Sequence, residues 1–104
     1  MVLIKEWGYE KKYDLLGILV KDYKKDDWKR TIELKTGFVI DILKDGTIGA
    51  IEILGWAQSC KVRPHQVKDM KIYVDIDVGE FSVKVTVTGE YKDKTHKIWG
   101  YCYK

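Results

Sequence analysis

The chain lacks asparagine and has one proline, two alanines and two cysteines among 104 residues. Two cysteines are too few for a disulfide framework, so we expect reduced thiols and a cytoplasmic protein. The longest apolar run, 15–20, is far shorter than the roughly 20 residues that span a bilayer. The amino terminus is charged and aromatic and does not resemble a signal peptide. Membrane and secreted classes are therefore not expected.

Arginine is also scarce, with two residues against 17 lysines and a net charge of +3. Arginine is the side chain that forms bidentate hydrogen bonds with phosphate groups and with the edge of guanine. Its scarcity therefore argues against sequence-specific recognition of nucleic acid. The absence of asparagine beside abundant lysine and isoleucine is typical of thermophile composition.

Branched residues dominate what is present: valine, isoleucine and threonine make up 27 positions. They favour strands, and a chain poor in alanine forms few long helices. We predict a single domain over 1–104 that is mainly β, with α+β as the alternative. Its expected form is an antiparallel meander of about seven or eight strands with local connections and at most one short helix near 56–70.

The first predicted hairpin covers 37–54 and turns at Asp45-Gly46, a typical two-residue type I′ turn. This turn pairs Leu43 with Ile48 and brings Ile40, Ile42, Ile51 and Ile53 to one face. The opposite face is mixed, so we expect partial cover by the rest of the chain or by another subunit. The apolar face carries Phe38, Ile40, Ile42, Ile51 and Ile53, and the mixed face carries Val39, Asp41, Leu43, Ile48, Glu52 and Leu54.

The second predicted hairpin covers 71–88 and turns at Gly79-Glu80, which suits a type II′ turn. Opposite Val78 this register places Phe81, and opposite Asp77 it places Ser82. The apolar side of the hairpin then carries Ile72, Val74, Ile76, Val78, Phe81, Val83, Val85 and Val87.

A final strand is predicted over 97–103, with its turn at Asp93-Lys94. Its outward positions form an aromatic stripe of Trp99, Tyr101 and Tyr103 on the polar side of the second hairpin, near Tyr73 and Lys84. Three interpretations stay open: a second small core covered by Trp7, Tyr9 and Tyr13, a protein interface, or a surface that stacks single-stranded nucleic acid.

Residues 13–62 resemble the YuzE-like family of small domains of unknown function. The resemblance is carried by Tyr13-Asp14, the apolar strand 16–20, the block GFVIDILKDGTIGAIEIL at 37–54, and WAQSC at 56–60. It implies a small β meander followed by a short helix, and some family members resemble partners of small toxin-like proteins. It implies no catalytic residues, and 71–104 would be a carboxy-terminal β meander extension.

Two groups of polar residues are candidate chemical sites. Asp41 and Glu52 share a face of the first hairpin, where a carboxylate pair could divide acid and base roles or bind a hard cation. Cys60, His65, His96 and Cys102 are all the cysteine and histidine of the chain, and could hold zinc. For the carboxylate pair we favour a solvated face with lysines nearby, for the cysteine and histidine set a coincidence of unrelated residues, and we expect no cofactor.

The sequence therefore favours a non-enzymatic protein-interaction module that self-associates or binds a small protein partner. The alternatives are a domain that binds RNA or single-stranded DNA through the aromatic and lysine face, and a small enzyme or metal-binding domain that uses Asp41 and Glu52.

Overall fold

The computed structural model describes residues 2–103 and confirms the mainly β class, with eight strands in two antiparallel sheets. The 56–70 region holds one short α-helix, α1, which ends at Cys60 with Lys61 in the left-handed region, and a separate 3-10 helix that begins at Pro64. No described helix is long and apolar enough to cross a membrane. The elements are β1 (Glu6–Glu10), η1 (Lys11–Tyr13), β2 (Leu15–Leu19), η2 (Lys25–Asp27), β3 (Trp28–Lys35), β4 (Phe38–Leu43), β5 (Ile48–Leu54), α1 (Trp56–Cys60), η3 (Pro64–Asp69), β6 (Lys71–Val78), β7 (Ser82–Tyr91) and β8 (Lys94–Tyr103).

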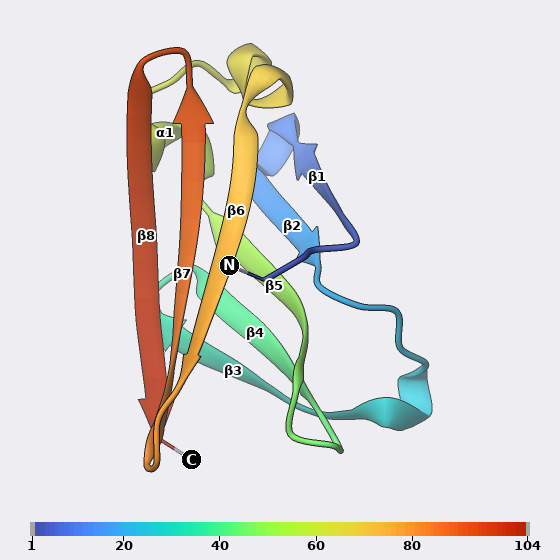
Figure 1. Cartoon of the computed structure of the whole chain (residues 1–104). Coiled ribbons are helices and arrows are strands. Elements are labelled where there is room, and N and C mark those ends of the chain that lie inside the picture. The colour runs from blue at the N-terminus through green and yellow to red at the C-terminus, as the bar shows by residue number, and fades with distance from the viewer. Residues whose placement is uncertain (1, 104) are drawn as a thin grey trace.

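Five strands form one sheet in the order β1-β2-β5-β4-β3, and three form a second in the order β6-β7-β8 (Figure 1). The three-stranded sheet is a simple meander, as expected. In the larger sheet β2 pairs with β5 and not with β3, so the connection over 20–27 crosses to the far edge. That connection is the exception to the expectation of local links, and it gives a Greek-key order.

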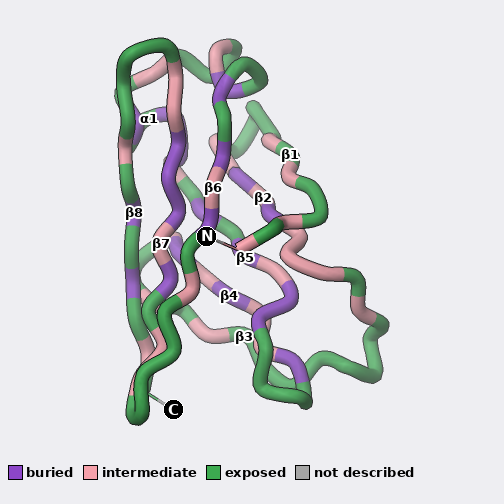
Figure 2. Tube along the Cα trace, viewed as in Figure 1, coloured by how far each residue is buried: buried purple, intermediate pink, exposed green. Residues whose placement is uncertain are grey.

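The two sheets face each other across a shared core, and buried positions follow the facing sides of both (Figure 2). Leu16, Phe38 and Ile51 come from the larger sheet, and Val74 and Val85 from the smaller one. Each of these side chains is at most 1% exposed. Because α1 and η3 lie at one end between the sheets, that end is filled while the other end is left to strand side chains alone (Figure 1).

The first hairpin keeps the predicted register away from its turn and departs from it near the turn. Phe38 pairs with Ile53 and Ile40 with Ile51, as expected. Gly49 is then bulged out, so Ile48 pairs with Ile42 and joins the core. Glycine fits at this position because a Cβ added at residue 49 would lie 2.6 Å from the ring of Tyr23.

The predicted type I′ turn is wrong. Gly46 has a φ of +85°, but Asp45 is not among the residues with positive φ, which a type I′ turn requires at both central positions. The Gly46 N–H donates to the Leu43 carbonyl and the Leu43 N–H to the Thr47 carbonyl, at 2.9 and 2.8 Å. A three-residue loop over 44–46 therefore replaces the two-residue turn.

In both hairpins of the smaller sheet each residue lies on the predicted face, but the pairing register differs from the predicted one by two residues. Val78 pairs with Val83, not with Phe81, because the loop is centred on 80–81. The predicted turn at Asp93-Lys94 would place Trp99 beside Thr88, but the last turn is at 92–93 and Trp99 pairs with Thr86. Phe81 is thus at a loop tip and 72% exposed, which corrects its placement in the apolar face.

Candidate functional site

The aromatic stripe lies on the outer face of β8. Trp99 and Tyr101 stack with ring centroids 6.4 Å apart, and Tyr103 meets Tyr101 edge to face at 5.9 Å. Their exposed fractions are 48%, 50% and 73%. Alternation along one strand places them in a row, since every second side chain points the same way.

The interpretation of the stripe as a second small core is wrong. Trp7 and Tyr9 pack against the main core from β1, and Tyr13 is itself exposed. The three rings of the stripe stay about half exposed or more, and the groups that lie over Trp99 are the ammonium groups of Lys35 and Lys84. The alternation of residues along the strand predicted that the three aromatic side chains share a face, but it could not predict that this face would be exposed to solvent.

Charges of both signs surround the stripe. The Lys84 ammonium lies 4.8 Å from the centroid of the Trp99 ring and the Lys35 ammonium 5.5 Å from it. On the neighbouring strand, Asp77 lies opposite Lys84. Tyr73 is half-buried, and its hydroxyl reaches the Glu90 carboxylate at 3.5 Å. The surface is therefore aromatic and mixed in charge.

The backbone of β8 is a second feature of this surface. Within residues 2–103, β8 has a ladder partner on its β7 side alone, although it runs for ten residues. A long edge strand presents a row of unpaired backbone donors and acceptors, which another strand can join. Stripe and open edge coincide on one strand.

The acidic pair sits on the outer face of the larger sheet. Asp41 lies opposite Ala50, so Glu52 is its diagonal neighbour on β5. The Asp41 carboxylate accepts hydrogen bonds from the hydroxyls of Tyr23 and Thr31, at 2.7 and 2.6 Å. Burial first, and then the bond to Asp41, raises the pKa of Tyr23 to about 12. Asp41 is thus engaged in holding the 20–27 connection to the sheet.

The four cysteine and histidine residues do not form one ligand set. His96 and Cys102 are six positions apart on β8, which separates them by about 20 Å. Cys60 is buried in α1. Among the residues described, no group of three or more histidine, cysteine, aspartate or glutamate side chains could hold a metal ion.

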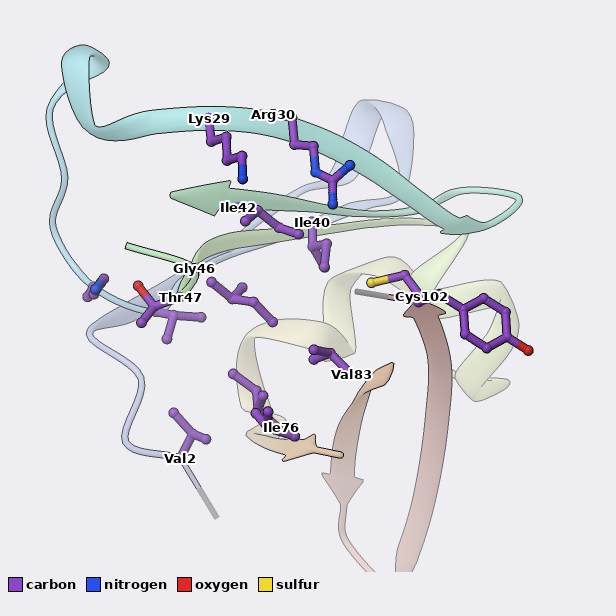
Figure 3. A pocket seen from close by; sticks show the side chains of 15 residues that line it. Val2, Lys29, Arg30, Ile40, Ile42, Gly46, Thr47, Ile76, Val83 and Cys102 are labelled. Carbon is purple, nitrogen blue, oxygen red and sulfur yellow. The ribbon is translucent and has the colours of Figure 1, made fainter. Parts of the chain in front are cut away.

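Sequence reasoning missed a hollow between the two sheets, at the end opposite α1 (Figure 3). It has a volume of about 690 Å³ and a mainly apolar lining, to which β4 contributes Ile40 and Ile42 and the smaller sheet Ile76 and Val83. Its existence depends on the angle between the sheets, which no local pattern carries.

The fold and these surfaces define the chain as a small antiparallel β protein of two facing sheets. Searches against protein-family models, curated proteins and solved structures found no match. The resemblance of 13–62 to the YuzE-like family stays a prediction.

Proposed function

We propose that the protein is a non-enzymatic interaction module that self-associates through β8. The observation that carries the proposal is the coincidence of an exposed aromatic stripe with an open ten-residue strand edge. Tyrosine and tryptophan dominate the energy of protein interfaces, and an unpaired edge supplies backbone hydrogen bonds in register. The two free cysteines support a reducing compartment such as the cytoplasm.

A pairing of two β8 strands about a twofold axis at Gly100 supports a second copy as the partner. In antiparallel pairing around this centre, Trp99 of one copy lies opposite Tyr101 of the other, and Lys97 lies opposite Tyr103. Aromatic pairs and cation–aromatic pairs are both favourable across strands, and no like charges meet. A twofold interface needs this kind of self-complementarity.

The mixed charge of the stripe favours a protein over single-stranded nucleic acid. A groove for nucleic acid tracks the phosphate backbone with cations. Here Asp77 lies opposite Lys84, and two lysine ammonium groups already lie over the ring of Trp99. A base would have to displace those ammonium groups in order to stack on Trp99.

The test is sedimentation of the wild type and of the double variant Trp99→Ala, Tyr101→Ala over the micromolar range. We expect a dimer for the wild type and, because truncating interface aromatics costs about 2 kcal/mol or more, a dissociation constant raised by about thirtyfold or more for the variant. Tyr13→Ala is the matched control, since Tyr13 is 56% exposed but lies outside the stripe.

Two outcomes would overturn the proposal. One is a monomeric wild type throughout the range with no protein partner recovered by pull-down. The other is salt-dependent binding of oligouridylate that the double variant loses and Tyr13→Ala keeps, which would assign the stripe to nucleic acid.

A further inference from the structure

The hollow between the sheets has the size and lining of a small-molecule site. Its volume of about 690 Å³ lies within the range of roughly 300 to 1,000 Å³ typical of ligand pockets. Both sheets contribute branched side chains to its floor and walls, so an occupant would be enclosed by aliphatic groups. An apolar chain buried there would gain about 0.8 kcal/mol for each methylene removed from water.

Two cations from β3 reach into the mouth of this hollow. Arg30 pairs with Ile42 and shares the inner face of the sheet with Ile32. Lys29 is the extra residue of a bulge between Trp28 and Arg30, and Figure 3 shows its side chain extending to the same side as that of Arg30. A bulge re-aims a side chain in this way. Neither cation has an ion-pair partner among the described residues.

The charge of the lining is of one sign. Among the described residues that line the hollow, the charged ones are Lys21, Lys29 and Arg30, and none is an aspartate or a glutamate. Lys21 is already paired with Asp45 at 3.1 Å, outside the lining. The guanidinium of Arg30 and the ammonium of Lys29 therefore remain for an anionic group, and guanidinium geometry matches a carboxylate.

We propose that this hollow binds a single-chain fatty carboxylate, with its tail between the sheets and its head at Lys29 and Arg30. The site meets the aromatic stripe at Tyr103, which also lines the hollow, but it does not include Trp99 or Tyr101, which carry the proposed association through β8. A neutral or cationic amphiphile with the same tail would fill the same apolar space but leave the two cations without a partner.

The chain carries its own reporter of occupancy. Cys102 lines the hollow, is half-buried, and has its sulfur turned toward the space (Figure 3). Cys60 is buried in the core, and burial, aided by the charge of Asp14, raises the pKa of its thiol to about 12. Since the thiolate is the reactive form, alkylation near neutral pH reports on Cys102, and Cys102→Ser supplies the blank.

The experiment measures the rate of Cys102 alkylation by a maleimide as laurate is added below its micelle concentration. We expect saturable protection, with the dissociation constant tightening by up to about fourfold per added methylene in a series of shorter to longer fatty acids until the hollow is full. Dodecanol and dodecyltrimethylammonium are the matched neutral and cationic probes, and both should protect at least tenfold more weakly.

The double variant Lys29→Gln, Arg30→Gln tests the head-group contact. Both residues are exposed, so the fold should persist, and laurate affinity should fall by about tenfold or more while dodecanol affinity stays the same. Lys12→Gln, on the surface of η1, is the matched control. Equal protection by the three amphiphiles, or none, overturns the proposal. Protection that rises with protein concentration and ignores laurate would assign the hollow to a second copy.

Discussion

The hydroxyl of Tyr9 donates a 2.5 Å hydrogen bond to Oδ1 of Asp14. The Asp14 carboxylate also accepts the backbone N–H groups of Ala57 and Gln58, at 2.8 and 3.2 Å. Those N–H groups belong to the first turn of α1, which has no acceptor of its own for them. A residue that precedes β2 thus caps a helix 43 positions further along the chain.

Asp14→Ala should lower the free energy of unfolding by about 3 to 5 kcal/mol. The change removes three hydrogen bonds to a charged acceptor and places alanine at a φ of +50°. Asp14→Asn should cost about 1 to 2 kcal/mol, because asparagine tolerates the left-handed region and keeps one acceptor oxygen. Urea denaturation measures both values, and equal losses for the two variants would contradict the capping role.

Gly89→Ala should destabilise the protein by about 1 to 3 kcal/mol, the usual range for overpacking. An added Cβ would lie 2.6 Å from Cζ2 of the fully buried Trp56 and equally close to Cε of Met70. Gly8→Ala is the matched control on another strand, since nothing lies within 4 Å of its added Cβ. Thermal unfolding of the pair checks the prediction, which fails if the two variants melt together.

Stability should fall as the pH rises from about 10 to about 12. The unfolded chain ionises Tyr23 near pH 10, whereas the pKa of Tyr23 in the folded protein is raised to about 12, chiefly by burial. Between pH 10 and pH 12 the unfolded state binds fewer protons than the folded state. The stabilisation that Tyr23 contributes is therefore fully present below pH 10 and is lost as the pH rises through about 12. The pKa of Tyr9 is raised as well.

Tyr23→Phe tests this alkaline dependence, because phenylalanine keeps the ring over Gly49 and removes the ionisable hydroxyl. We expect a shallower loss of stability between pH 10 and 12, followed by circular dichroism at a fixed urea concentration. A slope identical to that of the wild type would show that Tyr23 is not the group responsible.

Phe81→Ser should change the free energy of unfolding by less than about 0.5 kcal/mol, because Phe81 is exposed at a loop tip. Val85→Ser, by contrast, should cost about 3 kcal/mol or more, since Val85 is fully buried and the serine hydroxyl would lie in an apolar core. Comparable losses of unfolding free energy at the two positions would instead support the predicted register, in which both side chains face the core.

The alternation of branched residues in β6 and β7 predicts which side of each strand is buried, but not which residues pair. A slide by two residues changes every partner and leaves every face intact, so Val78 opposite Phe81 and Val78 opposite Val83 satisfy the same pattern. The choice between them is made in the turn, where the glycine at 79 suggested the wrong central pair.

The bulge at Gly49 and the hollow lined by Lys29 and Arg30 could not be predicted for a different reason. Gly49 lies against the ring of Tyr23, which belongs to a connection that crosses the sheet. The hollow depends on where two sheets splay apart. Both are set by long-range packing, whereas the aromatic stripe needed one strand and its parity.

The two edges of the smaller sheet are not alike. The Val2 N–H donates to the Val74 carbonyl at 2.8 Å, which forms an isolated bridge on the free side of β6. With that side of β6 engaged and β8 open, strand addition has a preferred direction. Copies that joined through β8 would use up the accessible edge of the smaller sheet in each other, so growth through this sheet would stop at a closed pair.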